Sequence, residues 1–267
     1  MLTTNYKIIR QLEEKQDKVS ELHLKVLIAN RHTIIVLKNK ERVIKLIELF
    51  IEQHETMEME KHLEIIFSSY DLKSDFKHVD FLILTNYFIN LPSILSTKEG
   101  NETLLKFTTE LPNGYVVRDD RVLDLSVCYG ITIGLKNYIE RTFHNAKISS
   151  QASVFIDCFL NHTQFSKTNF LINFIGKQME VAIKKDNKLQ LYNLFTYNSN
   201  EDALYYILFL VEQFQLSVIQ SKFTIIGQLE TQDELILSLK KYIKHLNFGV
   251  TQTPAQIPNH FYFTQLI

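Results

Sequence analysis

One order of secondary-structure patterns occurs twice along the chain, and this repeat restricts the fold more than any other feature. In the first copy three strand-like runs precede a helical run and a further strand, at 22–29, 33–38, 42–51, 57–70 and 79–84. The same order returns in the second copy, at 169–175, 178–184, 188–197, 201–214 and 222–227. Matching segments lie 143 to 147 residues apart. Because solenoid repeats are only about 20–50 residues long, this spacing predicts a duplicated domain.

Two lobes are therefore expected, over residues 1–147 and 148–267. Independent domains commonly have roughly 100–150 residues, so each lobe is large enough to bury a core of its own. The predicted fold class is mixed α/β, or α+β, with a strand–strand–strand–helix–strand–helix unit in each lobe. Two such lobes would enclose a cleft, which is where ligands usually bind.

Residues 42–51 fit a helix as well as a strand, because their apolar residues recur at both spacings. The matching run in the second copy alternates more clearly, with Leu189, Leu191 and Phe195 on one side. On the strength of that counterpart, a strand is predicted for 42–51.

The second lobe carries clear turn and helix signals. Asp186-Asn187 predicts a tight turn between two strands. Ser199 followed by Asp202 predicts a capping box at the start of the helix over 201–214. That helix is apolar on nearly every side, so burial on two sides is expected.

Several segments fall outside the repeat. Residues 1–18 are polar, and the pattern predicts a frayed or peripheral segment there, in which Tyr6–Leu12 could dock. The first lobe has extra material over 85–120, with a helix expected at 102–111, and a strand follows at 122–129. An amphipathic helix over 149–161 is expected to bridge the lobes.

Composition excludes several classes of protein. The net charge is −1, so there is no field to attract nucleic acid or anionic lipid. The longest apolar run, Ala203–Val211, has nine residues, against the roughly 20 that a membrane-spanning helix needs. The first residues have no signal-peptide pattern, and Cys128 and Cys158 are expected to be buried thiols instead of a disulfide. A cytoplasmic protein is predicted.

Two stretches of the second lobe resemble a known family. Leu191–Phe214 and Phe223–Ile243 are similar to the bacterial domain of unknown function 3822 family, and a looser likeness extends over 19–266. The family has no established activity. The resemblance implies the actin-like ATPase fold, which is built from two ribonuclease-H-like lobes.

ATP-binding proteins of the actin-like fold hold phosphates against a hairpin between the first two strands of each lobe. The hairpins typically read Asp-x-Gly, because glycine lets backbone N–H groups approach the anion and the carboxylate holds Mg²⁺. Here the first hairpin, Ala29–His32, has neither residue, and a later loop that is usually Gly-Gly is reduced to Gly227-Gln228.

The chain has only seven glycines, so few turns could bind a phosphate through the backbone. In the second hairpin Asn173 could replace the acid, while Gly176 lies one residue late. The candidate residues of a degenerate nucleotide cleft are these: Asn30, Arg31, Asn173, Gly176, Lys177 and Gly227.

No metal site or catalytic residue is predicted. His54, Glu58 and His62 are suitable zinc ligands, but the two histidines would lie about 12 Å apart along a helix. A ribonuclease-H-type nuclease needs carboxylates that converge on two metal ions. The first lobe offers three dispersed acids: Glu21, Asp80 and Asp124.

The sequence therefore predicts a non-catalytic interaction or scaffold module with a protein partner, no nucleic-acid partner and no cofactor. The alternative is an actin-like protein that still binds or hydrolyses ATP, with Mg²⁺, between its lobes. The aromatic segment His260–Phe263 is expected to pack on its own lobe, with an intermolecular contact as the alternative.

Overall fold

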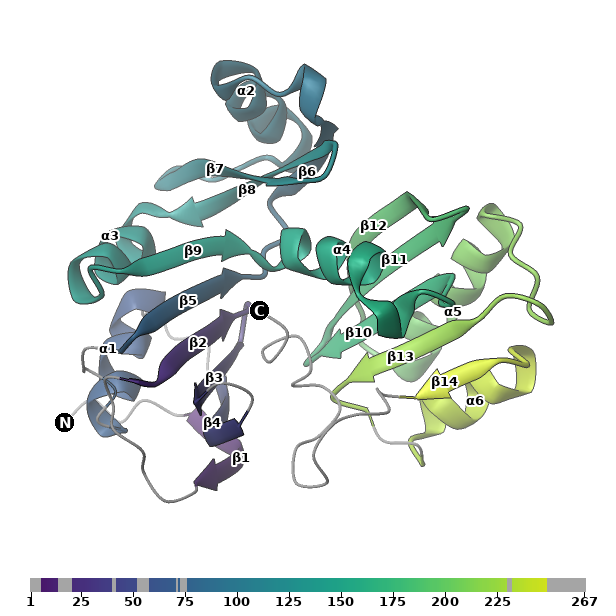
Figure 1. The fold of residues 1–267 in the computed structure, drawn as a ribbon, viewed down its shortest axis with the longest axis horizontal. Coiled ribbons are helices and arrows are strands. Elements are labelled where there is room, and N and C mark those ends of the chain that lie inside the picture. Colours follow the sequence, from purple (N-terminus) through teal and green to yellow (C-terminus); the bar gives the residue numbers. More distant parts are fainter. Residues whose placement is uncertain are drawn as a thin grey trace. The chain divides into compact units, whose positions relative to one another are not determined.

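The computed structural model describes residues 6–13, 21–39, 42–51, 58–70, 72, 76–229 and 232–248. The chain forms two compact units, Met1–Ser153 and Val154–Ile267, which are described separately (Figure 1). Their boundary falls inside helix α4, Gln151–Asn161, where the sequence predicts a helix. The division of the lobes after residue 147 stays a prediction.

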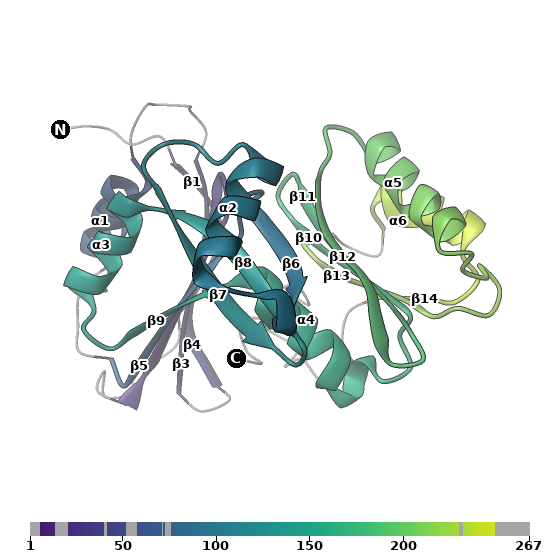
Figure 2. The same cartoon turned by 90° about the horizontal axis from the view of Figure 1, so that it is seen from above.

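The first unit contains two sheets and three α-helices among its described residues. In chain order its elements are β1 (Tyr6–Glu13), β2 (His23–Ile28), β3 (His32–Asn39), β4 (Arg42–Ile51), α1 (Met59–Ser69), β5 (His78–Ile83), β6 (Phe88–Pro92), the 3-10 helix η2 (Ser93–Leu95), α2 (Lys98–Thr109), β7 (Tyr115–Val122), β8 (Leu125–Thr132), α3 (Ile133–Thr142) and β9 (Ala146–Ser150). The larger sheet has the order β1-β4-β3-β2-β5-β9, and the smaller has the order β6-β8-β7. Helices α1 and α3 lie side by side on the larger sheet (Figure 2).

The second unit has one sheet with helices on both faces. After α4 its elements are the 3-10 helix η3 (Thr163–Phe165), β10 (Phe170–Ile175), β11 (Gln178–Lys185), β12 (Lys188–Thr196), α5 (Asn200–Gln213), β13 (Phe223–Gly227), α6 (Glu234–Tyr242) and β14 (Leu246–Phe248). The strand order is β12-β11-β10-β13-β14. Helices α5 and α6 cover one face, and α4 lies against the other (Figure 2).

The two units repeat the same topology. The order β4-β3-β2-β5-β9 matches β12-β11-β10-β13-β14, with antiparallel pairing among the first three strands and parallel pairing after them. Even single backbone hydrogen bonds recur. The N–H of Leu84 donates to Ile28 O, and that of Gln228 donates to Phe174 O, both at 2.9 Å. The predicted duplication is confirmed.

Each unit has its own apolar core. In the first, alternate residues of β2, β3 and β5 pack against α1 and α3, with Phe67 and Phe81 fully buried. In the second, alternate residues of β10, β11 and β13 pack against α5 and α6, with Phe170 and Phe223 stacked at 5.1 Å. The period of two that is seen in the sequence is therefore the core-facing side of each sheet.

Residues 42–51 form the predicted strand, because β4 pairs with β3 on one side and β1 on the other. Within the peripheral segment at the start of the chain, the stretch that could dock does so at residues 6–13. These residues form β1, an edge strand whose backbone covers the otherwise open hydrogen-bonding edge of β4.

The predicted strand over 122–129 is wrong in detail, because it spans the end of β7, a turn at Leu123-Asp124 and the start of β8. The helix expected at 102–111 begins earlier, at Lys98, because the Thr97 hydroxyl accepts a hydrogen bond from Gly100 N–H. Residues 88–132 thus form a small subdomain of three strands and α2, inserted between β5 and α3.

In the second unit, the capping box at Ser199 and Asp202 is confirmed, and Asp186 and Asn187 both have positive φ as a tight hairpin turn requires. The expectation that the helix over 201–214 is buried on two sides is wrong. Tyr205 and Phe209 of α5 are exposed and stack on each other at 6.0 Å, because β10, β11 and β13 cover only one face of the helix.

No helix in the described part of the chain is long and apolar enough to cross a membrane. Cys128 and Cys158 are both buried and form no disulfide with each other, as predicted. The aromatic segment at 260–263 lies outside the described residues.

Candidate functional site

The two hairpins singled out in the sequence occupy equivalent places in the two units. Arg31 O accepts a backbone hydrogen bond from Ile51 at 2.9 Å, and Lys177 O accepts the matching bond from Tyr197 at 3.0 Å. Arg31 and Lys177 are therefore structural counterparts. The residue before each is Asn30 in one lobe and Gly176 in the other.

In the first unit the β2–β3 turn lacks the glycine and the carboxylate of the phosphate-binding hairpins. The N–H of Ala29 is already used, donating to His32 O at 2.8 Å. Asn30 is exposed and Arg31 is half-buried. This turn has no glycine, which would allow an anion to approach the backbone closely, and no carboxylate, which would bind Mg²⁺.

In the second unit the β10–β11 turn is closed by a side chain of the same lobe. Gly176 has a φ of 57°, so the turn has the left-handed backbone that favours glycine. Its N–H, the donor that a phosphate would need, donates a short hydrogen bond to Oε1 of Gln228. Its carbonyl accepts from the Tyr197 hydroxyl at 2.8 Å. Both polar backbone groups of Gly176 are therefore occupied.

The remaining groups of this turn are also held within the lobe. The Nζ of Lys177 donates to Asn198 O at 3.2 Å and lies 5.5 Å from the centre of the Tyr197 ring. Burial, with Asp233 nearby, raises the pKa of Tyr197 to about 12, so its hydroxyl remains a donor at neutral pH. Tyr197 thus supports both residues of the turn.

The Asn173 side chain lies inside the sheet. Its side chain is 2% exposed, and Nδ2 donates to Glu180 Oε2 at 2.7 Å. Glu180 is fully buried and also accepts from the Tyr192 hydroxyl at 2.9 Å. Burial, with the Glu180 carboxylate beside it, raises the pKa of Tyr192 well above its ordinary value. These side chains form an internal polar cluster of the sheet.

Gly227 serves strand packing. Its φ is 108°, and a Cβ at this position would overlap the backbone N and O of Phe174 on the neighbouring strand. The counterpart of Gly227 in the first unit is Ile83, as the matching hydrogen bonds of Leu84 and Gln228 show. The glycine is required where β13 closely approaches β10.

The residues considered for metal chemistry do not come together. Glu58 is the residue before α1 and is exposed, His62 is buried on the helix, and His54 lies outside the described residues. Asp80 is on β5 of the larger sheet, whereas Asp124 is exposed at the β7–β8 turn of the smaller one. Among the described residues, no group of three or more His, Cys, Asp or Glu could hold a metal ion.

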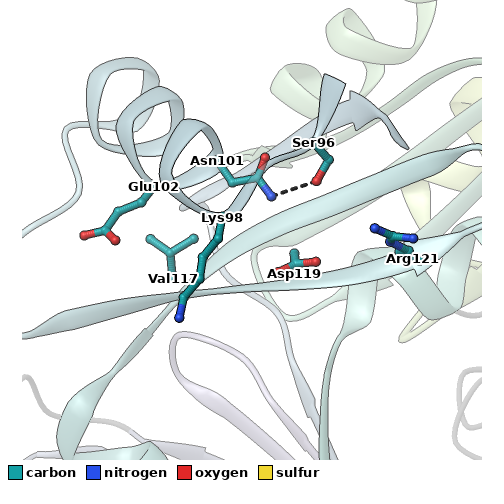
Figure 3. A pocket seen from close by; sticks show the side chains of 7 residues that line it. All are labelled: Ser96, Lys98, Asn101, Glu102, Val117, Asp119 and Arg121. Carbon is teal, nitrogen blue, oxygen red and sulfur yellow. Dashed lines mark hydrogen bonds between the residues drawn. The ribbon is translucent and has the colours of Figure 1, made fainter. Parts of the chain in front are cut away.

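A pocket of about 280 Å³ lies in the inserted subdomain, between α2 and β7 (Figure 3). Three alternate residues of β7 line one wall, and the start of α2 lines the other. The lining residues are Ser96, Lys98, Asn101, Glu102, Val117, Asp119 and Arg121.

The polar end of this pocket is fixed by hydrogen bonds. Asn101 Nδ2 donates to Ser96 Oγ at 2.8 Å, and Ser96 Oγ donates to Ser126 Oγ at 3.0 Å. On the opposite face of β7, Asp120 accepts from Ser150 N–H at 2.5 Å and from Ser153 Oγ at 2.9 Å, and burial raises the pKa of this carboxyl. The strand is therefore held with Val117, Asp119 and Arg121 toward α2.

The sequence model of a family described as protein of unknown function, DUF3822, matches residues 10–246. The chain belongs to the DUF3822 family. No curated protein sequence matches it.

The DUF3822 chain is similar in structure to a Bacteroides thetaiotaomicron VPI-5482 protein with an actin-like ATPase fold and unknown function. The two share 18% identity at a TM-score of 0.78, over 93% of this chain and 96% of the other. The type IV pilus biogenesis complex PilM–PilN has a similar chain, with 10% identity, a TM-score of 0.56 and coverage of 94% and 97%. The ethanolamine utilization protein EutJ from Carboxydothermus hydrogenoformans has 5% identity, a TM-score of 0.52 and coverage of 91% and 88%. The expected actin-like ATPase fold is confirmed.

Sequence reasoning identified the hairpins of this DUF3822 protein but missed two features. Gln228 was considered only together with Gly227 as a reduced loop, and the contact of its side chain with Gly176 was missed. The pocket beside α2 was also missed. Its lining residues come from two separate segments, 96–102 and 117–121, so no single stretch of the sequence indicates it.

Proposed function

We propose that this DUF3822 protein is a non-catalytic interaction or scaffold module of the actin-like fold that no longer binds nucleotide. One observation carries the proposal: the N–H of Gly176, at the turn where a phosphate would bind, donates to the side chain of Gln228. An anion could reach this N–H only after displacing a hydrogen bond within the lobe.

Other features support the same function. The Ala29–His32 turn of the first unit has no glycine or carboxylate, and no metal-binding group of His, Cys, Asp or Glu occurs in the described part of the chain. The PilM–PilN complex contains a chain of similar fold, so this fold is compatible with work in a protein complex. A protein partner and a cytoplasmic location are part of the proposal, and the location is in keeping with the reduced state of Cys128 and Cys158, which form no disulfide.

Thermal unfolding with and without Mg-ATP tests this function. A ligand at 100 times its dissociation constant stabilises a protein by about 2.7 kcal/mol, which corresponds to several degrees in Tm for a chain of this size. We expect no shift up to millimolar Mg-ATP, with a nucleotide-binding actin-like protein as the positive control. A saturable rise in Tm would favour the alternative, an actin-like protein that retains ATP.

A further inference from the structure

Strand β12 lies at the edge of the second unit's sheet, and among the described residues no strand pairs with its outer side (Figure 1). Directly after this strand, Tyr197 N–H donates to Lys177 O, on the β11 side. Antiparallel strands bond to one neighbour through every second residue, so the backbone groups of Tyr192, Leu194 and Thr196 point away from β11. These three residues therefore present N–H and C=O groups to a further strand.

The N–H of Leu194 is consistent with this direction. It donates to the side-chain Oδ1 of the adjacent residue, Asn193, at 2.9 Å. Such local side-chain bonds compete with the bonds of a sheet, and rotation of one half-buried side chain releases the N–H to the carbonyl of an added strand. The edge is therefore open to pairing.

The sequence of this edge lacks the usual protection against strand pairing. Residues 191–196 read Leu-Tyr-Asn-Leu-Phe-Thr, with no proline and no charged side chain. The irregularity in the β11–β12 ladder lies outside this stretch, toward the hairpin that joins the two strands. Because proteins block open edges with prolines, charges and bulges, a regular and uncharged edge is a site where another strand can add.

The first unit shows what covers the same edge. Its counterpart of β12 is β4, and the ladder irregularity of β3–β4 recurs at the matching place in β11–β12. Strand β1 pairs antiparallel with residues 45–51 of β4, which match 191–197. In the second unit the stretch of chain that would match β1 belongs to helix α4. Within the described ranges, β12 thus lacks the antiparallel strand that its counterpart has.

Strand β12 itself meets the requirements of the missing strand. The stretch 191–197 is centred on Leu194, and a two-fold axis there places Leu194 opposite Leu194 of a second copy. The same axis places Tyr192 opposite Thr196 of the second copy, so the outward N–H and C=O groups of all three residues are paired. Since residues 191–196 carry no charge, no repulsion opposes this pairing.

Exposed aromatic side chains extend the edge of β12 over α5. Phe195 packs on the α5 side of the sheet and stacks on Tyr206 at 4.9 Å. Tyr205 lies 5.7 Å from Tyr206 and stacks on Phe209 at 6.0 Å. Tyr205 is 62% exposed and Phe209 42%. We call these four residues the aromatic row. Antiparallel pairing about an axis perpendicular to the sheet keeps α5 on the same side in both copies, so both aromatic rows adjoin the junction.

We propose that the chain forms a two-fold homodimer in which β12 pairs antiparallel with β12 of a second copy. The two five-stranded sheets join into one continuous sheet, with the aromatic rows beside the junction. The pairing uses the same residues of both copies and closes the open edge of each. The proposal deepens the proposed function, on which it rests, by naming a second copy as a partner of the interaction module.

Sedimentation velocity of the full chain, from micromolar to millimolar concentration, tests the proposal. We expect the mass to rise from one chain to two and no further, because the two-fold pair leaves no β12 edge open. Leu194→Lys places two like charges directly opposite each other and should weaken the dimer by at least about tenfold. Leu194→Glu should do the same, and an equimolar mixture of the two variants should restore the dimer.

The first unit supports opposite charges at this place in a ladder. Its counterpart of Leu194 is Glu48, and the register places Glu48 opposite Arg10 of β1. An acidic and a basic residue are therefore accommodated across the matching pair of strands. Restored pairing in the mixture would also show that both variants still fold.

A second variant and a control complete the experiment. Thr196→Pro removes an N–H that points away from β11, so it should weaken the dimer without loss of a bond inside the lobe. Leu237→Lys, at a 49% exposed position on α6, adds the same charge away from β12 and should dimerise as the wild type does. Circular dichroism checks that each variant is folded.

Three results would overturn the dimer. They are a single-chain mass at every concentration, a dimer that neither Leu194→Lys nor Thr196→Pro weakens, and a mixture of the two Leu194 variants that remains monomeric although both are folded. A wild-type chain that remains monomeric would leave the interaction module with a different protein partner. A Tm shift with Mg-ATP, in contrast, would remove the proposed function itself.

Discussion

Single residues decide whether the nucleotide turns of this fold can work. Gly176 and Gly227 both have positive φ angles, and both residues make their contacts inside the second lobe. Gly176 is bonded to Gln228, and Gly227 lies against the backbone of Phe174. Glycine at these positions is explained by backbone geometry without any ligand.

Gly227→Ala should destabilise the protein by about 2–4 kcal/mol, since the new Cβ adds steric overlap with Phe174 to the strain of the positive φ. Chemical denaturation measures the loss. Gly114→Ala is the matched control, because Gly114 also has a positive φ, 84°, but nothing lies within 4 Å of its Cβ position. It should cost only about 1 kcal/mol. Equal losses in the two variants would contradict a packing role for Gly227.

At the scale of elements, the two hairpins differ in how they make the stability of the protein depend on pH. His32 of β3 is the counterpart of Gln178 in β11, and each is 7% exposed. Burial lowers the pKa of His32, with a smaller opposing effect from Glu48. The unfolded chain therefore binds a proton at His32 near pH 6.5, while the folded chain does not, so stability falls as the pH drops below that value.

His32→Gln, which copies the second lobe, should flatten this loss of stability with acid. Tm measured from pH 7.5 down to pH 5.5 checks the prediction, within the window set by the ordinary histidine pKa of about 6.5. His23, whose pKa is also lowered by burial, leaves part of the slope in place. A variant at His32 with an unchanged slope would refute the prediction.

The elements show how far the sequence could predict the fold. Strand patterns of period two predicted the meanders and parallel strands of both units, since alternate residues of each sheet pack into one apolar core. The β7–β8 hairpin was missed because its turn is Leu123-Asp124, which lacks the usual glycine or asparagine at the first left-handed position. The exposed stack of Tyr205 and Phe209 was missed because apolar content alone does not reveal which helix face is covered.

The sequence predicted which turns carry the candidate site residues, but not the contacts that these residues make. Asn30, Arg31, Gly176 and Lys177 could be located from the strand boundaries. The bond between Gly176 and Gln228 could not, because it joins residues that are far apart in sequence and brought together by parallel pairing of β10 with β13.

At the scale of the whole molecule, one topology has been used twice and has diverged in detail. The second copy closes its turn with Gln228, and the first copy has neither a glycine nor an acid at that turn. Among the described residues, the first copy alone carries the subdomain over 88–132, where the pocket lies. Because one fold can serve many functions, the proposed interaction role rests on these particular residues and not on the shared topology.

The backbone amide of Gly176 reports directly on the central claim. In a ¹⁵N–¹H NMR titration of the full chain with Mg-ATP, its resonance should stay in place up to millimolar nucleotide and should exchange slowly with solvent, because Gln228 holds the N–H. A saturable movement of the Gly176 resonance with added Mg-ATP would show that the turn still receives a phosphate and would contradict the proposed loss of nucleotide binding.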